Sequence, residues 1–284
     1  MKANLKLLLF IGFLLYTNRM FAQAEHYRIT ASLGTSAYNG DLVQGAPVAQ
    51  EFSPDFSIGL AYEIANKFRA RLNTSFLGVK GDDKYSTNSA LVARNLNFKS
   101  FVWEVALLGE YDLLDRRDYA IIPYVFGGPA FYHFNPTTID RNGNKVNLHD
   151  WDTEGEGLPG YPAPYHRAQI NLQFGFGTRY EITDGFSLGF EFCYRKLFTD
   201  YLDDVSGKYV DPAVIDYYVT NPAVALEMKQ LSFRGDEINP AAKVSVTEPR
   251  GNPSKKDVYY SFQLTATYCL GADPYNQKLI KTVF

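Results

Sequence analysis

Residues 167–181 read RAQINLQFGFGTRYE, and the alternation within this stretch indicates the architecture of the chain. Apolar side chains recur at every second position between Ala168 and Phe176, and small, polar or charged residues separate them. A period of two is typical of a β-strand whose two faces meet different surroundings, whereas a helix repeats its apolar residues every three or four positions. The stretch therefore predicts a strand with one apolar and one polar face.

Seven further segments alternate in the same way, which predicts eight strands. The other seven are residues 27–36, 55–64, 68–77, 97–111, 119–134, 186–198 and 258–270. The segment 119–134 is apolar on both faces and carries Pro123 and Pro129. Because proline lacks the N–H that a strand donates, we expect bulges or a rim position at these two residues.

The connections between the segments alternate between short and long. Short turns lie at 65–67, 112–118 and 182–185, and the other connections run about 18, 17, 32 and 56 residues, as in an up-and-down barrel. We therefore predict an all-β protein, an eight-stranded antiparallel up-and-down barrel. Two versions differ in which face points inward: a soluble lipocalin-like barrel and an outer-membrane barrel.

The residue types on the two faces favour the membrane version. The apolar faces carry bulky Phe, Tyr and Leu with almost no charge, and the polar faces mix Gly, Ser and Gln with Arg and Glu. We expect a transmembrane barrel with long extracellular loops and short periplasmic turns. The lumen charges would be Arg69, Arg71, Glu104, Glu110, Arg179, Glu181, Glu191 and Arg195. Because eight strands enclose little more than their own side chains, these charges should pair across the lumen and leave no channel.

The N-terminus has the features of an export signal. Lys2 and Lys6 precede a ten-residue apolar core, residues 7–16, and small residues such as Ala22 and Ala24 follow it. This predicts a signal peptide at 1–24, too short to span a bilayer as a helix, with an uncleaved anchor as the alternative. The barrel would then occupy 25–270, and residues 271–284 would form a periplasmic tail.

Composition excludes several classes of function. The net charge is −3 and the basic residues are spread along the chain, so no nucleic-acid partner is expected.

Cys193 and Cys269 fall on neighbouring antiparallel strands, offset along them by roughly 20 Å. A disulfide needs Cα atoms within about 7 Å, so we expect two buried free thiols.

Candidate catalytic groups are sparse. The densest cluster of polar residues, 149–154, fits no zinc-ligand spacing, and no GxSxG elbow occurs. His133 is the one candidate base for a barrel enzyme acting on lipid, and it lacks an evident partner. We therefore expect no enzymatic activity, no cofactor and no small-molecule substrate, with outer-membrane lipid as the surrounding partner.

An acidic stretch, RKLFTDYLDDVSGKY at 195–209, follows the seventh segment. Its loop-rim motif consists of Asp200, Tyr201, Asp203, Asp204 and Gly207. The spacing differs from an EF-hand, which leaves Asp200, Asp203 and Asp204 as a weak calcium candidate at the rim. The alternative is structural: Asp203 or Asp204 accepts backbone N–H groups or pairs with Arg234 or Arg250. Tyr201 would be an interfacial aromatic.

Several strings at the loop edges resemble the PorG-like outer-membrane β-barrel family. They are YNGDL (38–42), NFKS (97–100), PYVFGG (123–128), FYHFNP (131–136), TEGEGL (153–158), the acidic stretch 195–209 and RGNPSKKDVYY (250–260). The resemblance implies a non-enzymatic component of the type IX secretion and gliding-motility apparatus. It also implies that the short turns and the tail face a periplasmic ring of the PorK and PorN type. The alternative is a free-standing surface adhesin or envelope protein.

Overall fold

The computed structural model describes residues 26–183 and 185–271. The predicted signal peptide at 1–24 lies outside the described residues. So does the predicted periplasmic tail, apart from Gly271. No helix in the described ranges is both long and apolar enough to cross a membrane.

Eight long antiparallel strands close into a barrel, as the sequence predicted. The strands are β1 (Tyr27–Asn39), β2 (Ser53–Ala65), β3 (Phe68–Asp82), β4 (Asn97–Asp112), β5 (Ile121–Ile139), β7 (Ala168–Thr183), β8 (Phe186–Leu197) and β9 (Val258–Cys269). Each strand pairs with its neighbours in the chain, β1 pairs with β9, and the β4–β5 pairing completes the cylinder. A short additional strand, β6 (Lys145–Asn147), pairs with the last residues of β5.

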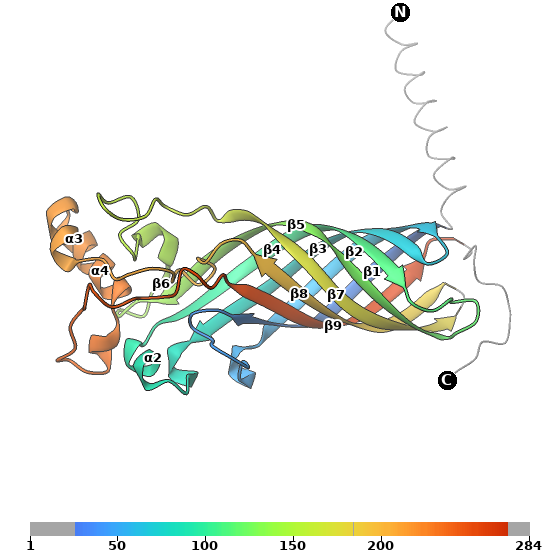
Figure 1. Cartoon of the computed structure of the whole chain (residues 1–284), viewed down its shortest axis with the longest axis horizontal. Coiled ribbons are helices and arrows are strands. Elements are labelled where there is room, and N and C mark those ends of the chain that lie inside the picture. The colour runs from blue at the N-terminus through green and yellow to red at the C-terminus, as the bar shows by residue number, and fades with distance from the viewer. Residues whose placement is uncertain (1–25, 184, 272–284) are drawn as a thin grey trace, which may run out of the picture.

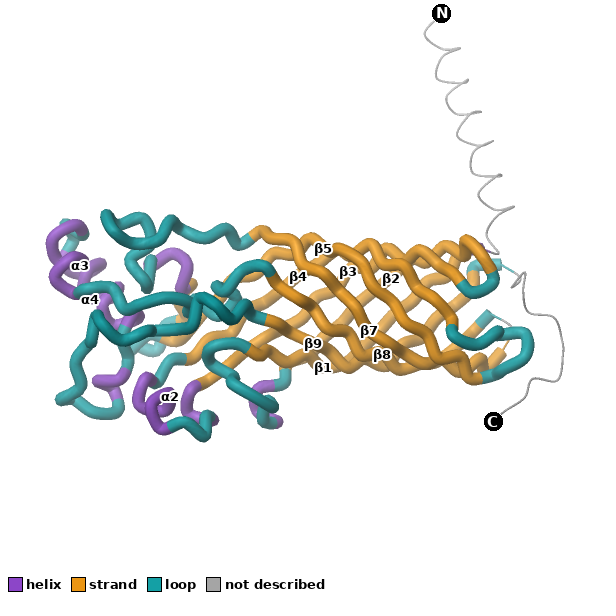
Figure 2. Tube along the Cα trace, in the orientation of Figure 1, coloured by secondary structure: helices purple, strands orange, loops and turns teal. Residues whose placement is uncertain are grey.

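The two ends of the cylinder are built differently (Figures 1 and 2). Short turns join the strands at one end, and the long connections 40–52, 83–96, 140–167 and 198–257 lie at the other. These loops contain the helices α2 (Ser89–Arg94), α3 (Pro212–Tyr218) and α4 (Pro222–Ser232), together with the short 3-10 turns η2 (Ala49–Glu51), η3 (Asp83–Tyr85), η4 (Leu148–Trp151) and η5 (Gly235–Glu237). Asp211 and Asn221 cap α3 and α4 by accepting a backbone N–H, and each helix begins with proline.

The apolar face of each strand points outward. Leu33, Ile170 and Leu264 expose 67%, 62% and 71% of their surface, whereas the charged side chains of the polar face are almost all buried in the interior. Such an arrangement would be unstable in water, where the apolar face must be covered. It suits a lipid environment and rules out the soluble lipocalin-like alternative.

The predicted bulge at Pro129 is wrong. Pro129 pairs in register with Leu172 of β7, and Pro123, near the end of β5, pairs with Thr178. The structure accommodates Pro129 by interrupting the ladder to β4 between Ala106–Ala130 and Gly109–Gly127, without an inserted residue. The neighbouring Gly128 permits this approach, since a Cβ there would lie 2.0 Å from the Leu107 carbonyl oxygen.

Two kinds of side chain fill the interior. Arginines and carboxylates occupy the half near the short turns, and a layer of apolar and aromatic residues that includes Tyr38, Phe98, Tyr132, Phe134 and Tyr259 lies toward the loops. The long loops fold over this aromatic layer and provide part of the same core through Leu148, Leu202 and Val205. The barrel is therefore filled along its length.

Candidate functional site

The mouth at the short-turn end is closed by one carboxylate that serves three arginines. Glu63 Oε1 accepts from Arg28 Nε at 2.7 Å and from Arg69 Nε at 2.9 Å. Arg116 donates to both oxygens, with Nη2 at 2.7 Å from Oε2. Arg116 belongs to the turn between β4 and β5, so this contact fastens the turn across the mouth.

The next layer is held by Arg69 and Arg179. Arg69 donates to Glu110 at 2.7 Å and to Asp112 at 2.8 Å, and Arg179 lies 3.1 Å from Asp112. The Arg179 guanidinium also stacks 3.9 Å from the centre of the Tyr124 ring. Each carboxylate here therefore meets at least one arginine, which offsets the cost of burying its charge.

Two further pairs cross the middle of the lumen. Arg71 donates twice to Glu191, at 2.6 and 3.1 Å, in the bidentate geometry that suits guanidinium and carboxylate. Tyr124 also donates to Glu191, at 2.6 Å. Arg195 donates to Glu104 at 2.8 Å, and the same carboxylate accepts from Tyr259 at 2.8 Å.

We call these side chains, together with Asp55, the lumen network. It consists of Arg28, Asp55, Glu63, Arg69, Arg71, Glu104, Glu110, Asp112, Arg116, Arg179, Glu191 and Arg195. A hollow within it that Arg69, Arg71 and Glu110 line has a volume of about 10 Å³, room for one water at most. The lumen network therefore blocks the barrel to ions and solutes.

Sequence reasoning placed seven of its eight lumen charges in this network. The eighth, Glu181, is half-buried beside the register shift that ends β7. Arg28, Asp55 and Glu63 were missed as members, although the same alternation places them on polar faces. Asp112 was missed because the predicted turn 112–118 begins there, whereas β4 continues to this residue. Arg116 carries no such signal because it lies in a turn, where period two ends.

At the opposite end the loops form a second polar cluster, which we call the loop cap. It comprises residues 40–43, 152–156, 199–207 and 250–257 (Figure 1). Tyr38 supplies its base, where the phenol donates to Asp203 and, at 3.0 Å, to Asp257. Asp203 accepts the Val205 N–H at 3.0 Å, and Asp257 accepts the Leu202 N–H at 2.9 Å.

Arg250 joins the loops of the cap. Its Nη1 lies 3.1 Å from Glu154, and its Nη2 lies 3.8 Å from Asp204. Glu154 in turn accepts the backbone N–H groups of Ser206 and Gly207, at 2.8 and 2.9 Å. Tyr165 donates to Asp204 at 2.7 Å. The Arg250 side chain thus links two loops, 140–167 and 198–257.

The acidic stretch has a structural arrangement. Both parts of the structural alternative occur, since Asp203 accepts a backbone N–H and Asp204 lies near Arg250. Arg234 does not pair with these aspartates in the described residues and instead donates to Glu237 and Thr138. Asp200 accepts a hydrogen bond from the Ser206 hydroxyl at 2.8 Å, so its partner differs from those of Asp203 and Asp204.

Two other expectations for the stretch are changed by the fold. The described residues hold no group of three His, Cys, Asp or Glu side chains arranged for a metal ion, so they lend no support to the calcium candidate. Tyr201 is half-buried and stacks on Tyr165, with 4.7 Å between ring centres, so it packs within the loops rather than standing at a lipid interface.

The loop cap holds carboxyl groups in unusual protonation equilibria. Burial, together with the nearby Asp41 charge, raises the pKa of Asp200 to about 7. Burial raises the pKa values of Asp203 and Asp257 well above the ordinary range, with a further contribution from the charge of Asp257 for Asp203 and of Asp200 for Asp257. Near neutral pH, Asp200 is therefore partly protonated.

The histidines that sequence analysis singled out have structural environments. His133 points out from the barrel wall and stacks on Trp103 at 6.0 Å. In the described part of the chain it makes no hydrogen bond to a serine, cysteine or carboxylate. His149 contacts the Tyr165 carbonyl oxygen at 2.9 Å and holds the loop 149–154 against the core. Cys193 and Cys269 are both buried and are not joined in a disulfide, as expected.

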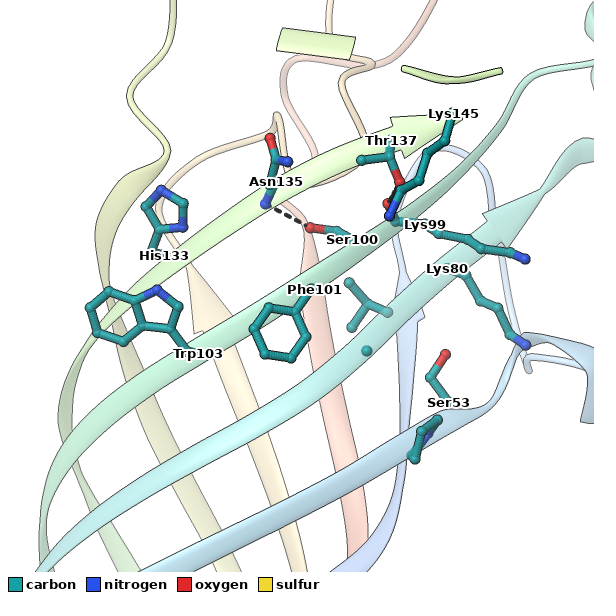
Figure 3. Close-up of a pocket in the computed structure, with 13 residues that line it drawn as sticks. Ser53, Lys80, Lys99, Ser100, Phe101, Trp103, His133, Asn135, Thr137 and Lys145 are labelled. Atoms are coloured by element: carbon teal, nitrogen blue, oxygen red, sulfur yellow. Dashed lines mark hydrogen bonds between the residues drawn. The ribbon is translucent and has the colours of Figure 1, made fainter. Parts of the chain in front are cut away.

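The outer wall also carries a hollow of about 560 Å³ on β2–β5 (Figure 3). Its lining includes Phe101, Trp103 and His133 on one side and Lys80, Lys99 and Lys145 on the other. The hollow faces the surroundings of the barrel rather than its lumen, because these residues alternate with the buried ones along each strand.

Comparison with known proteins agrees with this geometry. The family described as "Outer membrane protein beta-barrel domain" matches residues 7–212. The chain belongs to this family. It is an integral protein of the outer membrane, with its apolar wall in lipid and its charged interior shielded. The family is broader than the PorG-like resemblance, which stays a prediction.

Several solved outer-membrane proteins are similar to this chain at low sequence identity. Neisserial surface protein A is 10% identical, with 86% of this chain and 97% of that chain covered and a TM-score of 0.44. OprG from Pseudomonas aeruginosa is 10% identical, with 85% and 94% covered and a TM-score of 0.38. The outer membrane enzyme PagL is 11% identical, with 85% and 98% covered and a TM-score of 0.31. None of the curated proteins matches this sequence.

Proposed function

We propose that this protein is a non-conducting, non-enzymatic outer-membrane anchor for a protein secretion machinery. The observation that carries the proposal is the lumen network, which closes the barrel with buried ion pairs. A closed barrel acts through its ends and its wall. By the resemblance to the PorG-like family, the partner at the periplasmic end would be a ring of the PorK and PorN type.

The periplasmic end supports docking because it is held rigid. Asn66 donates to Asp115 at 2.8 Å, which joins two neighbouring turns, and Asp112 N–H donates to the Lys67 carbonyl at 2.8 Å. Arg116 fixes the longer turn to Glu63 inside the barrel. A partner that docks on a preordered surface avoids much of the entropy cost of ordering loops.

The surroundings of His133 within the described residues bear on the non-enzymatic part of the proposal. Ser100, which also lines the hollow, accepts the Asn135 N–H at 3.0 Å and is not hydrogen-bonded to the imidazole. A barrel enzyme would need a nucleophile and a base within hydrogen-bond reach. Purified protein should therefore leave phospholipid and lipid A unmodified, and His133→Ala should change nothing in that assay.

A pull-down in mild detergent tests the docking proposal. An affinity tag inserted at Gly143, in an exposed outer turn, leaves the periplasmic end free. We expect periplasmic ring proteins to co-purify with the barrel. The double variant Lys67→Glu and Asp118→Lys changes the periplasmic end and should reduce their recovery. Lys243→Glu with Glu248→Lys is the matched control at the outer end and should not.

Recovery of the barrel alone from the unmodified protein would contradict the docking proposal. It would favour the free-standing surface protein, for which one observation speaks: the loop 198–257 is folded, with its own small core around Val210, Ile215 and Met228. Deletion of the gene separates the two as well, because a secretion component is needed for export of the substrate proteins.

A further inference from the structure

The hollow on the outer wall combines two chemistries in a fixed order along the strands. Phe101 and Trp103 of β4 expose aromatic surface to the surroundings, and Lys99 lies at the loop end of the same strand. Figure 3 shows the lysine side chains gathered at the end of the hollow near the tip of β5, with Trp103 and His133 at the other end. The groove is therefore amphipathic along its length.

Three lysines line the same groove although their like charges repel one another. Lys80 and Lys99 are direct cross-strand partners of β3 and β4. Lys145, from β6, lines the same groove. Like charges in opposed positions destabilise a sheet unless an anion lies between them. The groove lining contains no Asp or Glu, and within the described ranges none of the three lysines has an ion pair.

Two acids lie near these lysines, in an adjacent hollow that Lys80 and Lys99 also line. Asp82 lies in the adjacent hollow and pairs with Lys84 at 2.6 Å. Glu51, also in that hollow, accepts the Val48 N–H at 2.9 Å. Arg167 adds further positive charge beside the groove, where it donates to Asn135 at 2.8 Å. The groove is thus lined by three lysines and no acid, and the nearby Glu51 and Asp82 have hydrogen-bond or ion-pair partners of their own.

The position of the groove relative to the bilayer limits which kind of anion can bind there. Lys99 and Trp103 are four residues apart, which is about 13 Å along a strand. Aromatic girdles of outer-membrane barrels lie at the lipid interface, so Trp103 marks the upper edge of the acyl chains. The lysines then lie at the level of the headgroups of the outer leaflet. An anion at that level, above an apolar floor, is a lipid headgroup.

We propose that this groove binds one membrane lipid with a phosphorylated headgroup from the outer leaflet. The phosphate contacts Lys80, Lys99 and Lys145, and an acyl chain lies along Phe101 and Trp103. Lysine ammonium groups suit phosphate as point charges, and the apolar floor restricts the site to a phosphate that carries a chain. The proposal does not depend on the docking of periplasmic partners.

Tryptophan quenching by brominated lipids tests the proposal, because Trp103 lines the groove. A Trp151→Phe background removes the other tryptophan of the chain. The protein is placed in micelles with dibrominated phosphatidic acid or, at equal mole fraction, dibrominated phosphatidylcholine. We expect preferential quenching by the anionic lipid, with a preference of at least about five-fold from contributions known for lysines at membrane surfaces.

Matched variants assign the preference to the groove. The triple variant Lys80→Gln, Lys99→Gln and Lys145→Gln should lose it, and the same three positions changed to Arg should retain it. Lys196→Gln, Lys208→Gln and Lys255→Gln remove equal charge outside the groove and should also retain it. Lys99→Gln alone should lower the preference, which gives a readout even if the triple variant does not fold.

Three results would overturn the proposal. One is equal quenching of Trp103 by the two lipids. Another is a preference that survives in the triple glutamine variant. The third is loss of the preference when excess inorganic phosphate is added, which would identify a site for free phosphate rather than for a lipid.

Discussion

The lumen network and the loop cap both bury many charged groups, but they solve the problem of charge in different ways. The lumen network contains six arginines and six carboxylates among the described residues, so its formal charges cancel. In the loop cap, Asp41, Glu154, Glu156, Asp200, Asp203, Asp204 and Asp257 are buried around Arg250. Arg250 alone cannot balance so many carboxyls, and several of them also accept from backbone N–H groups, phenols and hydroxyls.

The two regions therefore hold their carboxyl groups in different ways. A carboxylate that faces arginines stays ionised across a wide pH range, and its partners are fixed by bidentate geometry. A buried carboxyl that lacks a cation changes its protonation near neutral pH. The extracellular cap should therefore respond to pH around neutrality. Four experiments address this contrast.

Glu63→Gln should have the largest effect. It removes the carboxylate that Arg28, Arg69 and Arg116 share, so three buried guanidinium groups lose a counter-charge. We expect the free energy of unfolding to fall by about 4–5 kcal/mol. Urea unfolding in lipid vesicles, followed by heat-modifiable electrophoretic mobility, measures it. Asp118→Asn, exposed at the same end, is the control, and equal stability of the two variants would contradict the assigned role of Glu63.

Arg250→Met should loosen the loop cap and leave the barrel closed. The substitution keeps most of the volume but leaves Glu154 and Asp204 without their cation, at a cost of about 3 kcal/mol confined to the cap. Hydrogen exchange of the Ser206 and Gly207 amides, which donate to Glu154, reports it. Arg141→Met breaks an exposed pair and should cost about 0.5 kcal/mol or less. A lower barrel stability in Arg250→Met would show that cap and lumen are one unit.

Tyr38→Phe should have a smaller effect. It removes one hydroxyl, and with it the donor to both Asp203 and Asp257, while the ring continues to fill the core. The loss should be about 1–2 kcal/mol in cap stability, the scale of a buried hydrogen bond to an acid. The same exchange measurement applies, with the exposed Tyr217→Phe as control. No difference between the two variants would mean that the phenol does not hold the base of the cap.

The smallest expected effect is a pH dependence of the cap. The pKa of Asp200 is raised to about 7 in the folded protein, and an unfolded Asp titrates near 4. Between these values the folded cap binds protons that the unfolded chain has lost, so cap stability falls as pH rises through this range. Urea-induced exposure of Trp151, in a Trp103→Phe background, should occur at lower urea at pH 8 than at pH 5. Asp200→Asn should reduce the difference, and an equal midpoint at both pH values in the unmodified cap would contradict it.

Much of the fold could be predicted because it rests on a local pattern. Alternation between neighbouring residues fixed which side chain of β7 or β8 points inward, and the loop lengths fixed the up-and-down order. Pro129 failed as a bulge signal because the ladder to β4 could be interrupted on one side instead. β6 went unnoticed because three residues are too few to show a period. Arg116 went unnoticed because a turn has none.

The sequence by itself determined the number of long strands, the lipid-facing side of each and that Cys193 and Cys269 do not form a disulfide. Those properties follow from period two, which a few neighbouring residues set. Only the tertiary structure decided that Arg71 forms an ion pair with Glu191, that Tyr38 donates a hydrogen bond to Asp203, and that Lys80, Lys99 and Lys145 line one groove. The reason is that these contacts join residues far apart in the chain, and closure of the barrel and the register between strands bring them together.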